Sequence, residues 1–168
     1  MRRTIMIALI ALLALAIAAP TVLARNVNGV APTNVSSDPI VVNPGDYPGS
    51  CDFPFQLDFS GKAKTIDRPG DVFIFTSPDL NVTVTNLDND KQATFNEATF
   101  NVTGTLEQTT LANGDVVTVA RGRNFLIDPE AGTVIAIGDF SFVFNAKGEL
   151  IQPLEGEGQL IDVCAALQ

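Results

Sequence analysis

The sequence predicts an all-β domain in which an antiparallel meander closes into a small barrel of about eight strands. From Cys51 onward, β-branched and aromatic residues alternate with polar ones, and helix-period windows are essentially absent. Gly, Pro, Asn and Asp residues interrupt these runs. Because the connections are short, successive strands are expected to be antiparallel neighbours. The alternative architecture is a β-sandwich.

The predicted strands follow one another closely from residue 51. The first, 51–59, places Phe53, Phe55, Leu57 and Phe59 on one face. The later strands are 62–67, 71–76, 80–87, 93–111, 115–128, 132–145 and 154–164. Turn residues separate the runs at 60–61, 68–70, 77–79, 113–114, 128–132 and 145–148, with the Asn-Gly pair at 113–114 as the strongest hairpin signal.

Glycines inside the longer strands favour the barrel over the sandwich. They stand at Gly104, Gly122, Gly138, Gly156 and Gly158. A glycine in mid-strand weakens a flat sheet but allows a long strand to bend. A sandwich would instead use shorter strands with Greek-key crossovers.

Residues 1–24 have the layout of a secretory signal peptide. Two arginines at positions 2 and 3 precede an apolar run over 5–19, and Pro20 follows it. Small residues place cleavage between Ala24 and Arg25, with 18–19 as the weaker site. An uncleaved membrane anchor is the alternative, since 5–24 is just long enough to span about 30 Å of hydrocarbon. We expect removal, which would leave a secreted, extracellular protein without a membrane partner.

The mature chain is expected to have two parts. Residues 25–50 are rich in Asn, Pro, Gly and Ser and predict a flexible linker, in which Ile40-Val41-Val42 is a candidate short edge strand. Residues 51–168 form the single β domain. All 19 acidic residues and 8 of the 10 basic ones lie after position 24, so the mature net charge is −11 against −9 for the full chain. This acidity argues against a nucleic-acid partner.

Two cysteines, Cys51 and Cys164, bracket the domain and are predicted to form a disulfide, with two buried thiols as the alternative. The bond requires the first and last strands of the domain to be neighbours, as closure of the sheet into a barrel would make them. There is no His. Serine or cysteine nucleophiles activated by His and His-based zinc sites are therefore excluded, and two thiolates cannot complete a four-cysteine zinc site. No cofactor or metal is expected.

Several polar groups are candidate sites. Sequons at Asn34, Asn81 and Asn101 predict either glycans or simply polar strand exteriors. Oxygen ligands at 86, 88, 90 and 97 match a calcium-loop template poorly, because Lys91 occupies the position that needs glycine. An acidic hairpin loop is the simpler interpretation.

Arg123, Asp139 and Asp162 are the candidate ligand-binding or acid–base residues. An arginine in a barrel mouth can hold an anion, although pairing with surface carboxylates is the simpler role for Arg123. Asp139 and Asp162 lie in runs rich in apolar residues. Asp58 and Glu107 are further carboxylates that such chemistry could use, and catalysis would require at least two of them to converge in a cavity.

Short motifs resemble a group of small secreted bacterial two-Cys proteins that are uncharacterised. They are Cys51-x-Phe53-Pro54, Thr85-Asn86, Asn101-Val102-Thr103-Gly104, Gly122-Arg123-Asn124-Phe125-Leu126 and the closing 162–167. The resemblance implies export and a two-Cys β domain, and no catalytic residue. This chain has Asp52 where that group usually has Gly. A fainter architectural likeness, with Gly-Arg-Asn, is to dirigent and allene oxide cyclase barrels.

The sequence thus favours a non-enzymatic secreted module. It would bind a small apolar ligand or serve as an extracellular structural or surface component. Eleven Phe residues, among them Phe140, Phe142 and Phe144 on one face, can either line a cavity or fill a core. The alternative function is an isomerase or cyclase that uses buried carboxylates.

Overall fold

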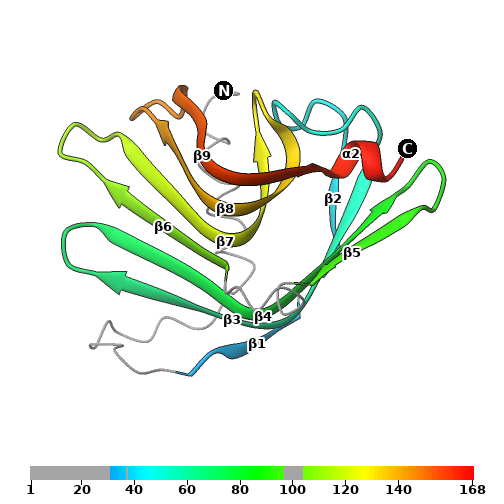
Figure 1. The fold of residues 1–168 in the computed structure, drawn as a ribbon, viewed down its shortest axis with the longest axis horizontal. Helices are drawn as coiled ribbons and strands as arrows, with labels where there is room; N and C mark the ends of the chain where they lie inside the picture. The colour runs from blue at the N-terminus through cyan, green and yellow to red at the C-terminus, as the bar shows by residue number, and fades with distance from the viewer. Residues whose placement is uncertain (1–30, 37, 97–103) are drawn as a thin grey trace.

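The protein is one antiparallel sheet in the computed structural model, which describes residues 31–36, 38–96 and 104–168 (Figure 1). The main strand order is β1-β3-β4-β6-β7-β8-β9, while β2 pairs with β3 and β5 with β4. One short helix, α2, follows the last strand of the described chain. The bounds are β1 Thr33–Ser36, β2 Ile40–Val42, β3 Phe55–Arg68, β4 Val72–Asn86, β5 Gln92–Asn96, β6 Gly104–Thr110, β7 Val116–Asp128, β8 Gly132–Phe144, β9 Leu150–Asp162 and α2 Val163–Ala166.

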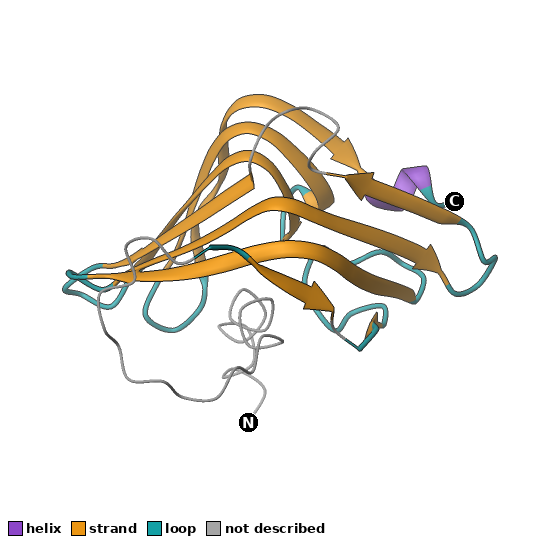
Figure 2. Cartoon of the chain, turned by 90° about the horizontal axis from the view of Figure 1, so that it is seen from below, coloured by secondary structure: helices purple, strands orange, loops and turns teal. Residues whose placement is uncertain are grey.

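The all-β, antiparallel prediction is confirmed, but closure into a barrel is not. β9 stands at one end of the strand order and β1 at the other, and the described strands at the two ends do not pair. The strands also do not divide into the two sheets of a sandwich. Seen from below, the sheet is a strongly curved layer that stays open (Figure 2).

Two predicted turns are bends inside long strands. Ser60-Gly61 and the stretch 77–79 were expected to end strands, yet β3 and β4 run through them. In the register, Gly61 lies opposite Leu80 and Lys62 opposite Asp79, and the pairing shifts at a bulge between Lys62 and Lys64. The bulge raises the local twist and bends both strands at the same level.

A row of glycines continues this bend across the sheet. Gly122, Gly138 and Gly158 are directly opposite one another on β7, β8 and β9. A Cβ on Gly138 would lie 2.2 Å from the carbonyl oxygen of Glu157, and one on Gly158 would lie 2.2 Å from that of Ile137. The φ angle of Gly138 is +138°, which L side chains rarely adopt. The predicted role of these glycines in bending long strands therefore agrees with the structure.

The bend divides the sheet into two parts, which we name by their ends. The latched half carries the disulfide and comprises 55–59, 80–86, 92–96, 123–128, 132–137 and 159–162. The free half ends in the hairpin turns of β3–β4, β6–β7 and β8–β9 and comprises 60–77, 104–121 and 139–157. In Figure 1 the free half lies to the left and the latched half to the right.

Large apolar side chains fill the interior of the latched half. Phe55, Val84, Ile135, Val163 and Leu167 are all at most 1% exposed and belong to one hydrophobic cluster. They come from β3, β4, β8 and the C-terminal segment. The aromatic face predicted for the first strand is confirmed as core, because Phe53, Leu57 and Phe59 are buried as well.

The remaining boundaries differ from the prediction in detail. The candidate edge strand at 40–42 is present as β2, and a further short strand, β1, lies in the predicted linker. The single strand expected over 93–111 corresponds to β5 and β6, and 97–103 lies outside the described residues. The expected leader, 1–24, also lies outside them.

Replacing Gly138 with alanine should destabilise the protein by about 2–4 kcal/mol, because strain at positive φ adds to the clash with β9. Gly70→Ala is the matched control. Its φ is +85° and a Cβ there would meet nothing within 4 Å, so we expect only the conformational cost of about 1–2 kcal/mol. Urea denaturation of both variants makes the comparison, and equal losses would contradict the packing role of the glycine row.

Candidate functional site

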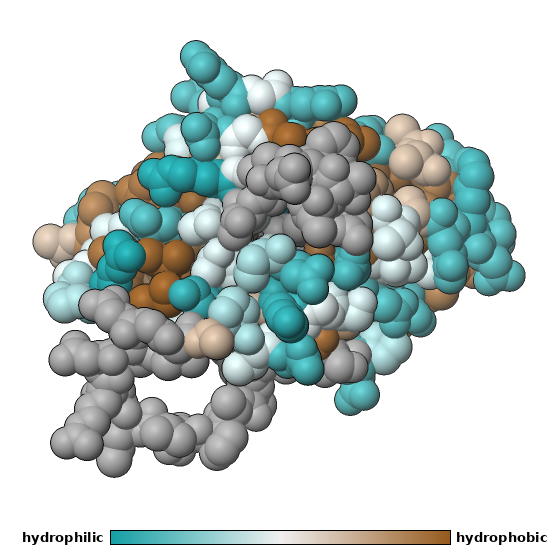
Figure 3. Space-filling view, turned by 60° about the horizontal axis from the view of Figure 1, so that its bottom comes forward, coloured by the Kyte–Doolittle hydropathy of each residue, from teal (hydrophilic) through white to brown (hydrophobic). Residues whose placement is uncertain are grey.

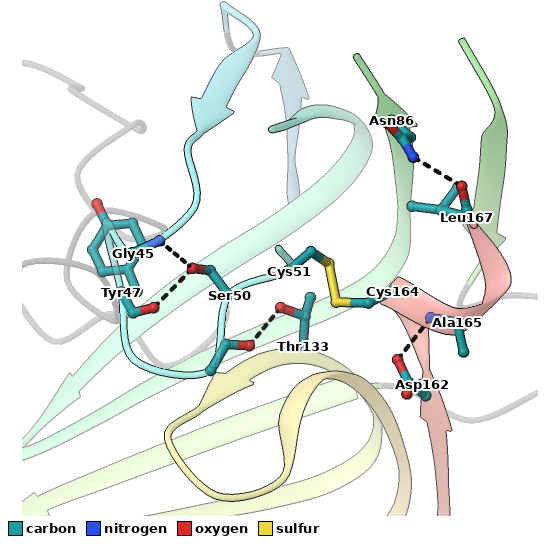
Figure 4. The surroundings of a disulfide bond; sticks show 11 residues. Gly45, Tyr47, Ser50, Cys51, Asn86, Thr133, Asp162, Cys164, Ala165 and Leu167 are labelled. Atoms are coloured by element: carbon teal, nitrogen blue, oxygen red, sulfur yellow. Dashed lines mark hydrogen bonds between the residues drawn. A yellow bond between two sulfur atoms is a disulfide. The ribbon is translucent and has the colours of Figure 1, made fainter. Parts of the chain in front are cut away.

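The ends of the domain are joined by a disulfide between Cys51 and Cys164 (Figure 4). Their Cα atoms are 5.4 Å apart and 113 positions separate them in sequence. The predicted bond is confirmed, but the inference that it requires neighbouring strands was wrong. Cys51 precedes β3 and Cys164 lies in α2, so a loop and a helix, rather than paired strands, carry the bond across the opening.

The C-terminal segment is clamped to the β4–β5 hairpin. The carbonyl oxygen of Leu167 accepts from the Nδ2 atoms of Asn86 at 2.9 Å and Asn89 at 3.2 Å. Lys91 Nζ donates to the carbonyl oxygen of Gln168. Leu167 is fully buried and Asn86 is 3% exposed, so the first of these bonds is shielded from water. We call Asn86, Asn89, Lys91 and Leu167 the C-terminal clamp.

The segment before Cys51 packs on the turn between β7 and β8. Thr133 Oγ1 donates to the carbonyl oxygen of Gly49 at 3.0 Å, and Ser50 Oγ donates to that of Tyr47 at 2.8 Å (Figure 4). Burial, and secondly the charge of Asp46, raise the pKa of the Tyr47 phenol above its ordinary 10.0. Residues 47–50 are therefore held against the latched half rather than acting as a flexible linker.

Aromatic side chains gather on one face of the free half, which we call the inner face. Two rows cross it at successive levels of the register. One row is Phe75, Leu106, Ala120 and Phe140, and the other is Phe73, Gln108, Thr118 and Phe142. Alternation along each strand places these residues together, because every second side chain points to the same side.

The inner face also contains one polar pair. Gln108 Nε2 donates to Thr118 Oγ1 at 3.4 Å, and Thr118 is fully buried. Phe142 packs edge-to-face on Phe144, with 5.8 Å between ring centroids. An apolar surface with a few placed polar groups is the usual chemistry of a small-molecule site.

The outer face of the free half is different. Its rows mix β-branched residues, such as Val117, Val119 and Val143, with charged ones. Arg121 Nη1 lies 3.7 Å from Glu107 Oε2 in a partly exposed ion pair. Figure 3 shows brown apolar surface interrupted by teal polar side chains on the left of the view.

The three candidate residues do not form one site. Arg123 is 6% exposed and lies opposite Ile137. Asp139 is exposed on the outer face, opposite Arg121 and Glu157. Asp162 is the N-cap of α2, where its Oδ1 accepts from the Ala165 backbone N–H at 3.0 Å.

The two further carboxylates also lie near the surface. Asp58 accepts from Gln56 Nε2 at 2.9 Å, and Glu107 pairs with Arg121. Neither is among the buried residues. The described carboxylates thus do not meet in a buried cluster of the kind that the alternative enzymatic function requires.

The other predicted sites are placed as follows. Asn34 is exposed on β1, Asn81 is half-buried on β4, and Asn101 lies outside the described residues. In the calcium-loop region, Asn86 Oδ1 accepts from the Asp88 backbone N–H, and Glu97 is not described. Within the described ranges no three acidic or Cys side chains are grouped to hold a metal, and no helix is long and apolar enough to cross a membrane.

Sequence reasoning missed two features of this region. The C-terminal clamp depends on Asn86 and Asn89, which lie in the stretch that was interpreted as an acidic hairpin loop. The inner face uses Phe73, Phe75 and Leu106, which were not singled out. Continuing the strand alternation from Phe140 and Phe142 onto neighbouring strands would have found them, had the register been known.

Asn86→Ala should destabilise the protein by about 1–3 kcal/mol, because it removes a buried hydrogen bond to Leu167. Asn89→Ala removes the partly exposed bond to the same oxygen and should cost less than about 1 kcal/mol. Chemical denaturation under oxidising conditions measures both. A larger loss for Asn89→Ala would show that the clamp is not organised around Asn86.

Tyr47 is the only tyrosine and there is no Trp, so ultraviolet absorbance follows this side chain alone. Its native titration midpoint should lie above 10.0 and return to the ordinary value in urea. Because the native pKa is raised, Tyr47 contributes stability that is present below pH 10 and is lost as pH rises through the native midpoint. Asp46→Asn should lower the native midpoint only in part, since burial is the larger cause. A native midpoint at or below 10.0 would contradict the packed state of 47–50.

Comparison with known proteins adds no relative. No family model matches the chain. Searches of curated proteins and of solved structures also found no match. The resemblance to secreted two-Cys proteins therefore stays a prediction.

Proposed function

We propose that the mature chain is a secreted, non-enzymatic module that binds a small apolar ligand on the inner face of its free half. The observation that carries this proposal is the concentration of aromatic side chains on one face of the free half. Two rows there contain four Phe residues. Phe75, Phe140 and Phe142 are buried and belong to the same hydrophobic cluster as Phe55 and Ile135 of the latched half.

The chemistry of the inner face fits an apolar molecule with one polar group. Phe rings and Leu106 would contact the apolar body, and burial of such surface contributes roughly 25 cal/mol per Å². The Gln108–Thr118 pair offers amide and hydroxyl groups to a polar end. Nothing in this arrangement needs a titrating nucleophile or base.

Secretion is supported by the leader-like first 24 residues and by the disulfide, since such bonds persist in oxidising compartments. The acid-rich composition keeps such a protein dispersed in solution. In the mature chain the Cys51–Cys164 disulfide would hold the sheet ends together, instead of hydrogen bonds between the first and last strands. The finer version of this proposal is a small barrel whose two edges are joined by this bond.

The binding test uses residues 25–168, because the proposed mature chain begins at Arg25. Native mass spectrometry would look for a copurifying apolar molecule, and displacement of a lipophilic fluorescent dye would measure affinity. We expect dye binding in the micromolar range, about −8 kcal/mol. If no molecule copurifies and no dye binds, the role as an extracellular structural or surface component takes its place.

A pair of variants locates the ligand. Ala120→Leu adds bulk between Leu106 and Phe140 on the inner face and should weaken dye binding at least about tenfold, or about 1.4 kcal/mol. Val119→Leu adds bulk to the adjacent residue on the outer face and should leave binding unchanged. Circular dichroism checks that both variants fold. Equal effects of the two would place the dye elsewhere.

A further inference from the structure

β9 leaves one side of its backbone without a described partner strand. It is the last strand in the sheet order and pairs with β8 alone. Over 155–162 its register with β8 is continuous, and the irregular pairings are confined to the part nearer Phe144. A regular edge strand presents a row of N–H and C=O groups that can pair with another extended chain.

The side chains of this edge leave room for an added strand. Residues 155–160 are exposed one after another, and Leu160 is 42% exposed. Gly156 and Gly158 leave one side of the strand without side chains. Phe140 Cε2 lies only 2.9 Å from where a Cβ on Gly158 would be, so this ring covers the glycine from the neighbouring strand.

The charges along the β9 edge favour a basic partner segment. Glu155 and Glu157 point to the same side of β9, and Glu157 lies opposite the exposed Asp139. Neither glutamate side chain has a hydrogen-bond or ion-pair partner among the described residues, although both backbones pair with β8. β9 carries no basic residue beside Glu155 and Glu157. The neighbouring Asp139, on β8, lies opposite Arg121 on its other side.

A second copy of the chain would bring one acidic strand against another, because β9 carries acidic and no basic residues. An antiparallel pair of β9 strands centred on Gly156 would place Glu155 of each copy opposite Glu157 of the other. Like charges directly opposite each other on a sheet are destabilising. A basic strand would instead gain two favourable cross-strand pairs, each contributing about 0.2–1 kcal/mol.

We propose that the edge of β9 over 155–160 binds an extended, basic segment of a partner protein by strand addition. The segment carries Lys or Arg at two positions separated by one residue, opposite Glu155 and Glu157. An aromatic residue between them packs over Gly156 beside Phe140, as aromatic side chains do over edge glycines. Backbone pairing supplies affinity and the alternating side chains supply specificity. Glu155 and Glu157 lie on the outer face, whereas the aromatic residue reaches the rim of the inner face at Phe140. The variant E155Q/E157Q therefore tests this proposal separately, because it leaves the inner face unchanged.

The test uses the mature, oxidised chain and a short synthetic peptide with Lys-Phe-Lys at its centre. Calorimetry gives the affinity, and amide chemical shifts locate the peptide. We expect shifts along β9 and weaker binding by about three- to tenfold for E155Q/E157Q, which is the loss of two cross-strand charge pairs. The matched control D88N/D90N removes two exposed acids from the β4–β5 turn and should bind like the natural chain.

A second peptide with the same side chains but N-methylated backbone amides separates strand addition from charge attraction. It should lose binding, because it cannot donate to the edge. The proposal is overturned if the two peptides bind equally well, if D88N/D90N weakens binding as much as E155Q/E157Q, or if no peptide binds. Formation of a β9-linked dimer in sedimentation runs would overturn it in favour of a second copy.

Discussion

The structure depends on one constraint. A disulfide and the C-terminal clamp join the two ends of a sheet whose first and last strands do not pair. A sheet whose first and last strands do not pair would expose the large side chains of its concave side. Here Cys51–Cys164 and the C-terminal clamp bring α2 against β8 and the β4–β5 hairpin. Under the chain-entropy model, a loop of 113 positions gives at most about 4–5 kcal/mol, a large share of the stability of a domain this size. Leu167 adds buried apolar area at the same point.

Because the sheet bends sharply at one level, its two ends can be joined while the strands keep ordinary antiparallel pairing. Gly138 and Gly158 let β8 and β9 approach closely, and Gly122 lies at the same level on β7. The bulge beside Gly61 bends β3 and β4 at the matching level. One hydrophobic cluster then runs through both halves, from Phe55 and Ile135 in the latched half to Phe75 and Phe140 in the free half.

Local signals predicted most of the fold, and long-range pairing limited the rest. Alternation identified the strand content and the buried faces of β3 and β8, and two cysteines in an export-type sequence were enough to predict the disulfide. Two bends were wrongly predicted as turns, at Ser60-Gly61 and at 77–79. The residue types that form turns also form bends within strands, and only the register between β3 and β4 distinguishes the two. A closed barrel was predicted because the disulfide was taken to require pairing of the first and last strands. In the structure α2, and not a paired strand, carries Cys164 to Cys51. Asp162 illustrates the same limit for the site: its apolar sequence neighbours suggested an acid–base residue, but it is exposed and caps α2.

Native-state hydrogen exchange of the Cys51→Ala/Cys164→Ala variant against the oxidised natural chain tests the central role of closure most directly. Loss of the bond should speed exchange most at α2, at the end of β9 and in the β4–β5 hairpin, because these segments are held together by the closure. Amides of the β6–β7 hairpin in the free half should change least. A uniform increase across the sheet, or unchanged protection at α2 and the hairpin, would contradict the account.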